Sequence, residues 1–350
     1  MSVLELGYVT SPSGVLLLID TGFLNMWSHD RVPVMPDGIL SSQEATDRAN
    51  TFVDLAIVGK DAVKAGRLLA WHWDPRYAFD QAPEKGKIWQ ALEEIVAKNG
   101  LDARFEVLPA RIPHRTRTIS AMEFGDGAGE MFFQGATAVA VNDIPTGVPL
   151  RVHGTMEPEY ERWDMITIEC RPGVVASTQH VGHVWVDQAR ILIADLNALG
   201  EWKHEESVDG LADYLFWGAD APKVASAFEA PLVTASQYGW LDLPFDDALD
   251  RGFAVEDYQE EHKLRFAGDF RPHSHHWHVL KETRASETHS GSIDVGGATM
   301  LNFFTLWGDG SYDVYRDFDA AGSLVRIRID LATSAKPKLK AMMERMKSES

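Results

Sequence analysis

The densest group of side chains able to do chemistry is a histidine cluster in the segment RPHSHHWH. It consists of His273, His275, His276 and His278. In an extended segment the first two would face one side and the last two the other, because side chains alternate along a strand. Each pair could then supply ligands to a divalent metal such as zinc or iron. No established zinc spacing such as His-Glu-x-x-His is present, so a solvated polar loop is the competing interpretation.

A second candidate site lies in the segment AWHWDPRY, where Trp71 and Trp73 flank His72 and Asp74 follows. The two indole rings could stack on an aromatic or sugar-like ligand. His72 with Asp74 could act as an acid and base pair. An aromatic edge of the core would explain the same pattern without a ligand.

Carboxylates supply a third candidate, because Glu123 and Glu287 occupy equivalent positions in two similar segments of the chain. Two copies facing each other would bring these carboxylates into one cleft, where they could work as acid and base. With Asp309 and the histidine cluster, Glu287 would form the catalytic set of a hydrolase or lyase between the copies. Two exposed glutamates at strand edges are the alternative.

These candidates belong to a chain that repeats itself. LLLIDTGFLNMWSHD, residues 16–30, matches ILIADLNALGEWKHE, residues 191–205, without a gap. The matched positions include Leu17 and Leu192, Asp20 and Asp195, Trp27 and Trp202, and His29 and His204. Tryptophan and histidine are rare, so their coincidence favours a duplication over a chance match between amphipathic segments.

Two further blocks match in the same order. FVDLAIVGKDAVKA, residues 52–65, resembles LADYLFWGADAPKVA, residues 211–225, and a third block is anchored on Gly-Ala-Thr at 135–137 and 297–299. We therefore predict an α+β fold of two tandem, diverged copies of a β-rich domain, each closing with an antiparallel meander. The copies span residues 8–172 and 184–333, and a basic tail or helix follows over residues 334–350.

The elements of each copy can be read from the same blocks. The apolar runs that end at Asp20 and Asp195 predict two buried strands, and each aspartate marks the end of its strand. Asp61 and Asp220 stand where the N-cap of a following helix is expected. A long amphipathic helix is predicted over residues 84–100 in the first copy, with only a shorter acidic helix in the second.

The end of the second copy predicts strands joined by tight turns. Asp309-Gly310 is a strong hairpin signal between GATMLNFFTLW and SYDVY, and Asp319 to Gly322 predicts a second, looser turn. The single cysteine, Cys170, follows an apolar strand pattern and is expected to be a small buried side chain.

This closing segment, LWGDGSYDVYRDFDAAGSLVRIRIDL, resembles the end of a bacterial family known only as the domain of unknown function numbered 4241. The matching residues are Trp307, Gly308, Asp309, Gly310, Tyr312, Val314, Tyr315 and Gly322. The resemblance implies a β-rich fold and no particular activity. If the closing loop is functional, Trp307 and Tyr312 are its candidate ligand-binding residues, and the first copy, with Ile144-Pro-Thr-Gly147 there, lacks the motif.

Composition narrows the class of protein. The 350 residues carry a formal net charge of -19, which repels nucleic acids and anionic membranes. The beginning of the sequence lacks the pattern of a signal peptide, and no apolar run reaches the ~20 residues of a membrane helix. We expect a cytoplasmic, acidic binding protein. Its negative charge would attract a basic protein partner, as in an immunity protein, and a small-molecule ligand is the other expectation. The alternative is the hydrolase or lyase with a carboxylate and histidine site.

Overall fold

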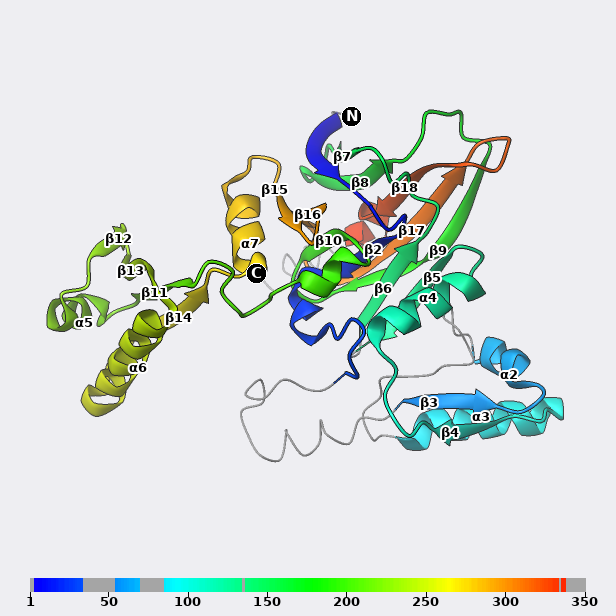
Figure 1. Ribbon diagram of the computed structural model, residues 1–350, viewed down its shortest axis with the longest axis horizontal. Coiled ribbons are helices and arrows are strands. Elements are labelled where there is room, and N and C mark those ends of the chain that lie inside the picture. Colours follow the sequence, from blue (N-terminus) through cyan, green and yellow to red (C-terminus); the bar gives the residue numbers. More distant parts are fainter. Residues whose placement is uncertain (1–2, 34–53, 70–84, 134–135, 334, 338–350) are drawn as a thin grey trace, which may run out of the picture. The chain divides into compact units, whose positions relative to one another are not determined.

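The computed structural model describes residues 3–33, 54–69, 85–133, 136–333 and 335–337 (Figure 1). It is an α+β protein with more strand than helix, as the sequence predicts. The chain divides into two compact units, one formed by Met1–Glu201 with Glu282–Ser350 and one by Trp202–Lys281. The larger unit contains strands from both ends of the chain, and the smaller one is a continuous segment.

Two antiparallel six-stranded sheets build the larger unit (Figure 1). The first sheet has the order β1 (Val3–Val9), β7 (Leu150–Glu157), β8 (Arg162–Glu169), β18 (Leu324–Asp330), β17 (Gly310–Phe318) and β9 (Ser177–Val186). The second has the order β15 (Ser290–Val295), β16 (Ala298–Phe304), β10 (Arg190–Asp195), β2 (Leu16–Asp20), β6 (Ala136–Val141) and β5 (Ala128–Phe133). One hydrophobic core contains side chains of both sheets.

The repeated apolar segments are the two central strands of the second sheet. β2 and β10 pair antiparallel, with Leu18 opposite Ile193, and every side chain of both strands is buried. Leu18 and Ile193 belong to the core shared by the two sheets, while Leu17 and Leu192, on the alternate face, are also fully buried. Burial on both faces explains why these strands are continuous apolar runs.

Short helices pack on the second sheet. η1 (Thr21–Met26) follows β2 and η2 (Ala198–Glu201) follows β10, whereas α4 (His114–Phe124) and the last turn of α7 (His275–Ala285) pack on the edge strands β5 and β15. α4 lies so close to β5 that a Cβ on Gly129 would stand 2.3 Å from the Ala121 carbonyl oxygen. A Cβ on Gly291 of β15 would likewise stand 2.6 Å from the backbone nitrogen of Thr283.

A smaller α+β layer completes the larger unit. It contains β3 (Leu55–Val58), β4 (Arg104–Val107), α2 (Ala62–Leu68) and α3 (Lys85–Asn99), around a core that includes Leu55, Leu92 and Phe105. The predicted helix over residues 84–100 is therefore confirmed as α3. It ends before Gly100, whose φ of +61° suits a residue without a side chain.

The smaller unit is a four-stranded antiparallel sheet with two complete helices and the first turns of α7. Its strands have the order β12 (Leu232–Thr234), β13 (Gln237–Pro244), β11 (Leu211–Trp217) and β14 (Ala267–Pro272), and its helices are α5 (Ala221–Phe228) and α6 (Phe245–His262). Tyr214, Phe216 and Val255 lie at the centre of its core. With 18 residues, α6 is longer than the 15-residue α3, so the expectation of a shorter helix is wrong.

Two further local expectations need correction. Asp309-Gly310 does not close a hairpin, because β16 lies in the second sheet and β17 in the first, so the chain crosses between sheets here. Asp61 and Asp220 do precede helices, but their side chains make no capping bond. Each carboxylate instead accepts a backbone N–H from the neighbouring strand segment, from Asp102 and Arg265 respectively.

The predicted turn at Asp319 is confirmed. β17 and β18 pair antiparallel across it, and Asp319 Oδ1 accepts the N–H groups of Ala321 and Ser323 at 2.8 and 2.9 Å. Each half thus closes with two hairpins, one in each sheet, in place of a single meander. Most of the predicted basic tail, residues 338–350, lies outside the described residues.

Candidate functional site

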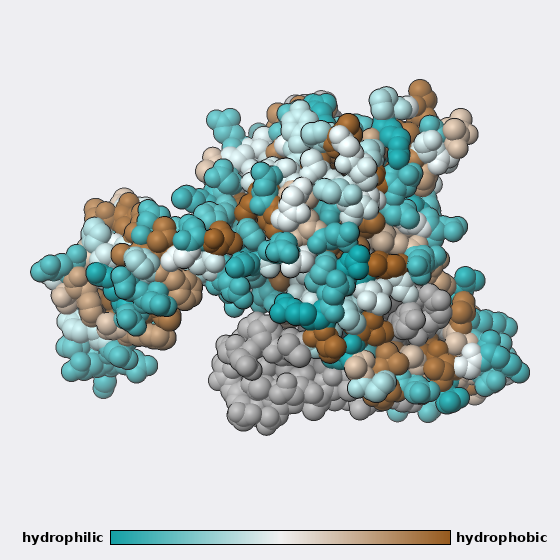
Figure 2. All heavy atoms as spheres, viewed as in Figure 1, coloured by the Kyte–Doolittle hydropathy of each residue, from teal (hydrophilic) through white to brown (hydrophobic). Residues whose placement is uncertain are grey.

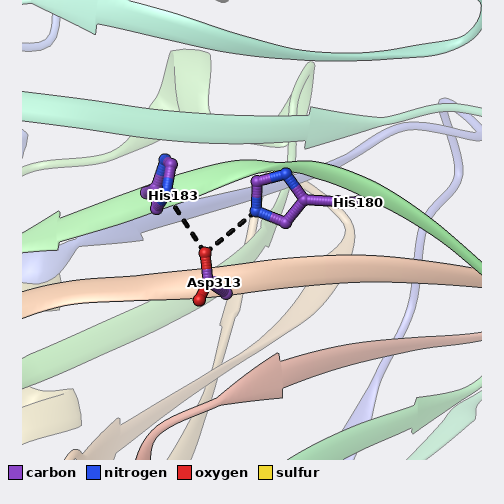
Figure 3. Close-up of side chains that lie close together, drawn as sticks. All are labelled: His180, His183 and Asp313. Atoms are coloured by element: carbon purple, nitrogen blue, oxygen red, sulfur yellow. Dashed lines mark hydrogen bonds and ion pairs between the residues drawn. The ribbon is translucent and has the colours of Figure 1, made fainter. Parts of the chain in front are cut away.

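Two histidines and an aspartate converge on one edge of the first sheet (Figure 3). His180 and His183 lie on the edge strand β9, and Asp313 lies on its neighbour β17. His180 Nε2 is 2.9 Å and His183 Nε2 3.1 Å from the same carboxylate oxygen, Asp313 Oδ1. The three side chains are between 26 and 43% exposed, so a small molecule in solution can reach them.

A β-bulge places both histidines on the same face of the sheet. Residues three apart on a regular strand point to opposite faces. In β9, however, Gly182 is opposite Val314 and His180 is opposite Tyr315, so Val181 is an extra residue. The extra residue shifts the alternation by one, so His180 points to the same face as His183. Strict alternation in QHVGHVW would place the two histidines on opposite faces, so the sequence pattern alone does not predict this pair.

A fourth side chain approaches from the second sheet. Glu130 of β5 is buried, with its side chain only 4% exposed, and its Oε2 lies 3.7 Å from His183 Nδ1. Gly182 permits this approach, because a Cβ there would stand 2.6 Å from Glu130 Oε2. His183 is further fixed by its own carbonyl oxygen, which accepts the hydroxyl of Thr137 at 2.7 Å.

This arrangement has the chemistry of a divalent metal centre. The donor atoms of His180, His183 and Asp313 all lie within 4.8 Å of one another. Ligands bound to Zn²⁺ at about 2.0–2.1 Å stand roughly 3.3 Å apart, so small side-chain adjustments would suffice. Two imidazoles and one carboxylate are a donor set of catalytic zinc and of non-haem iron sites, which leave coordination positions open for water or substrate.

A second group of histidine and carboxylates lies in the smaller unit. His273 is buried between Asp209 and Asp213, with Nδ1 3.0 Å from Asp209 and Nε2 3.1 Å from Asp213. Burial lowers the pKa of His273, but the two hydrogen bonds outweigh it, so its pKa is raised. Despite the cost of burial, hydrogen bonds from His273, from the backbone N–H of Leu211 and from the hydroxyl of Ser207 lower the pKa of Asp209 to about 2. With a carboxylate at each ring nitrogen, His273 bridges β11 and the loops beside it.

The four predicted metal ligands of the smaller unit have three different environments. His278 lies beside His273, with ring centroids 5.5 Å apart, and can join Asp209 and His273 as a ligand group. His275 Nδ1 accepts the backbone N–H of Lys203, and His276 stacks on His204 with ring centroids 3.9 Å apart. The segment is helical from His275 onward, so the alternation expected of an extended segment does not apply.

The predicted catalytic carboxylates do not come together. Glu123 is exposed on α4, which packs on β5, whereas Glu287 precedes β15 at the opposite edge of the same sheet. Asp309 is exposed, and its Oδ1 accepts the N–H of Ala189 at 3.0 Å. Glu287 instead lines a pocket beside His289.

The predicted ligand-binding aromatic residues have structural contacts. Tyr312 is 1% exposed, and its hydroxyl donates to the Gly308 carbonyl oxygen at 2.7 Å. Trp307 donates its indole N–H to the Trp163 carbonyl oxygen at 2.6 Å and lies under the guanidinium of Arg162. Trp71, His72 and Trp73 lie outside the described residues.

Comparison with known proteins found no matching family model, no similar curated protein and no similar solved structure. The resemblance to the family of unknown function numbered 4241 therefore stays a prediction. Among the described residues, no helix combines the length and apolarity that crossing a membrane requires.

Proposed function

We propose that the protein is a metal-dependent hydrolase that binds a divalent transition metal, zinc or iron, through His180, His183 and Asp313. The observation that carries the proposal is the convergence of two imidazole nitrogens on one carboxylate oxygen at an accessible sheet edge. A metal with open positions lowers the pKa of a bound water and so supplies a nucleophile near neutral pH. Each ligand residue is held by an extended strand, which fixes the direction of its side chain.

Glu130 supports a metal site at the histidine pair. It is a buried carboxylate next to a ligand histidine, at 3.7 Å from His183 Nδ1. A carboxylate at that nitrogen would fix the tautomer that presents Nε2 to the metal. Oriented in this way, His183 would bind through the nitrogen that already faces Asp313.

A tandem duplication would place this site at the junction of the two copies. The strand orders support the duplication, since strands from the first half occupy one end of each sheet and those from the second half the other. β2 then meets β10, and β8 meets β18. Glu130 would come from the first copy and Asp313 from the second, and the two histidines from β9, which leads into the second copy and pairs with its β17.

The matching position in the first half has an ion pair where the second has the two histidines. β1 has a bulge at Gly7, which precedes Gly182 by the same interval that separates Asp20 from Asp195. Beside that bulge, Arg151 Nε donates to Glu5 Oε2 at 2.8 Å. An ion pair there and a histidine pair in the second half support a function acquired by one copy.

Metal content tests the proposal directly. Untagged protein is purified, loaded with Zn²⁺ or Fe²⁺, dialysed and analysed for metal by mass spectrometry, alongside His183→Ala and the control His262→Ala. His262 is an exposed histidine of α6 that stacks on Tyr258, outside the site. We expect one tightly held metal per chain in the wild type and the control, and loss of at least about tenfold in affinity in His183→Ala.

Hydrolysis is tested with the same proteins on p-nitrophenyl carboxylic and phosphoric esters. The proposal requires metal-dependent turnover that His183→Ala abolishes and His262→Ala retains. Equal, substoichiometric metal in all three proteins would refute the metal site. Stoichiometric metal without turnover of either ester would refute the hydrolase and leave a metal-binding protein.

Binding of a basic partner is the second candidate function, and α6 favours it. This helix exposes seven acidic side chains: Asp246, Asp247, Asp250, Glu256, Asp257, Glu260 and Glu261. In Figure 2, hydrophilic spheres lie over part of α6, next to hydrophobic ones. Phe253, 55% exposed, lies among them. A lysine-rich peptide should bind with a rate that falls with salt and falls further in Asp250→Asn with Asp257→Asn. A rate unaffected by either change would exclude this face.

A further inference from the structure

The smaller unit has its own group of metal-binding donors, and it shares no residue with the histidine pair of β9. Asp209 lies in the loop before β11, His273 directly follows β14, and His278 lies in α7. The donor atoms of these three side chains all lie within 4.8 Å of one another. All three belong to the compact unit Trp202–Lys281.

A buried carboxylate orients the ring of His273. Asp213 of β11 is 7% exposed, and its Oδ1 lies 3.1 Å from His273 Nε2. The same oxygen accepts the backbone N–H of Asp242 at 2.9 Å, which holds the carboxylate in place. A carboxylate at one nitrogen of a metal-binding imidazole fixes the tautomer, so that the other nitrogen binds the metal. Nδ1 is therefore the nitrogen of His273 that is placed to bind a metal.

The two other donors lie on the Nδ1 side. Asp209 Oδ2 is 3.0 Å from His273 Nδ1, and the Asp209 side chain is 41% exposed, so a cation in solution can reach it. The half-buried imidazole of His278 lies beside that of His273, with ring centroids 5.5 Å apart. Among the described residues, neither ring nitrogen of His278 has a hydrogen-bond partner. This imidazole is free to bind a cation together with its two neighbours.

The Nε2 side offers a poorer set of ligands. Its donors are Asp213, Asp242 and the single imidazole of His273. Asp242 is 74% exposed and lies 3.7 Å from Nε2. Zinc prefers imidazole to additional carboxylates, and only the Nδ1 side brings two imidazoles together. The geometry therefore separates a side that binds the metal from a side that holds the ring.

The first half of the chain has a fixed cation in the matching place. Arg117 and His278 are both the fourth residue of their helices, α4 and α7. Asp54 and Asp213 are matched in the sequence repeat. Arg117 pairs with the buried Asp54, whereas the carboxylate of Asp213 faces His273. The first half thus neutralises its buried carboxylate with a guanidinium, and the second half has two metal-binding imidazoles instead.

We propose that the smaller unit binds Zn²⁺ through Asp209, His273 Nδ1 and His278, with Asp213 as the positioning residue behind His273. Two imidazoles and one carboxylate suit zinc better than calcium or magnesium, which prefer oxygen ligands. Asp209 is a loop residue, so this zinc exchanges more readily than the metal held by the paired strands β9 and β17, and dialysis removes it. The site stands independently of the hydrolase proposal.

Calorimetric titration of the metal-free full chain with Zn²⁺ tests the site. We expect two classes of binding site in the wild type. His278→Ala and Asp209→Asn should each weaken the looser class at least about tenfold and leave the tighter class unchanged. His183→Ala should do the reverse, so failure of one site is distinguished from failure of the other. His262→Ala, an exposed histidine of α6 in the same unit, is the control and should change neither.

Nitrogen-15 NMR of the histidine rings tests the orientation of His273. Zinc should shift the Nδ1 resonance of His273, while Nε2 keeps its proton. Asp213→Asn keeps the size of the side chain but removes its charge, so it should weaken the looser class roughly tenfold and populate both tautomers in the metal-free protein. Zinc bound at Nε2, a wild type without the looser class, or equal zinc binding by His278→Ala and His262→Ala overturns the proposal.

Discussion

Asp20 and Asp195 each hold the loop that leads into the strand of the other. Asp20 Oδ2 accepts the N–H groups of Asp187 and Gln188 at 2.6 and 2.9 Å, just before β10. Asp195 Oδ2 accepts the N–H of Ser13 at 2.8 Å, just before β2. Because β2 and β10 are neighbours at the centre of one sheet, the exchanged contacts lock the two halves together.

Removal of either carboxylate should destabilise the larger unit. Asp20→Ala leaves the buried N–H of Gly22 and the part-buried N–H groups of Asp187 and Gln188 without their acceptor. We expect a loss of about 1–3 kcal/mol in the free energy of unfolding, measured by urea denaturation. Asp319→Ala is the control, since water can reach this partly exposed carboxylate, and it should cost less than about 1 kcal/mol.

The two aspartates should act independently. They sit at opposite ends of the β2 and β10 pair, where Asp20 is opposite Ile191 and Asp195 is opposite Leu16. Losses in Asp20→Ala and Asp195→Ala should therefore add within about 0.5 kcal/mol in the double variant. A double variant no less stable than either single one would show that the two contacts form one network.

Gly182→Ala should weaken metal binding without touching a ligand. The new Cβ would stand 2.6 Å from Glu130 Oε2 and 2.9 Å from Glu130 Cβ, so the glutamate must move away from His183. Loss of such an outer contact typically costs about 10–100-fold in metal affinity, which calorimetry with Zn²⁺ measures. Gly147→Ala, at a position with open space around it, is the control. Equal affinities in both variants would contradict the role given to Glu130.

The smaller unit should lose stability as the pH rises through neutrality. The raised pKa of His273 means that its contribution is complete below the unfolded value of about 6.5 and is lost through the higher folded value. Asp209 contributes in the opposite range, since its pKa of about 2 means that stability is lost only as the pH falls below about 4.

The measurement compares His273→Gln with its parent between pH 5 and 9. His278 faces the same network and has a pKa lowered by burial and by nearby His273, so both proteins carry His278→Gln. The difference in thermal midpoint should be largest near pH 5 and shrink towards pH 9. Asp213 and Asp242, the other carboxylates facing His273, remain in both. A constant difference across this range would show that His273 acts through packing alone.

The sequence predicted the helices and strands better than it predicted which strands pair. Residues 55–58, 62–68 and 211–217 form the expected strands and helix because periodicity and turn residues are local signals. Pairing is not local: Asp309-Gly310 marks a real change of direction, but the next strand joins a different sheet.

The candidate site was harder to predict for the same reason. His180 and His183 share a face only because of a one-residue bulge, and Asp313 lies 130 residues away from His183. The metal site predicted at residues 273–278 rested on the density of histidines alone. A helix that begins at His275 gives these histidines different environments. Comparison of the halves offered the usable signal, since Gly7 and Gly182 recur at the interval of the repeat.

Cys170 should be unreactive until the larger unit unfolds. Its side chain is 6% exposed in the core between the sheets, and burial raises the pKa of the thiol to about 12. At pH 8 only roughly one buried thiol in 10⁴ would be ionised, and the thiolate is the reactive form. Native protein should therefore release no coloured thionitrobenzoate from Ellman's reagent. Protein unfolded in guanidinium should release one equivalent per chain. Val174→Cys is the positive control, because position 174 is 86% exposed. The native variant should release one equivalent of thionitrobenzoate. Rapid reaction of native wild-type protein would mean that the end of β8 opens far more often than this packing allows.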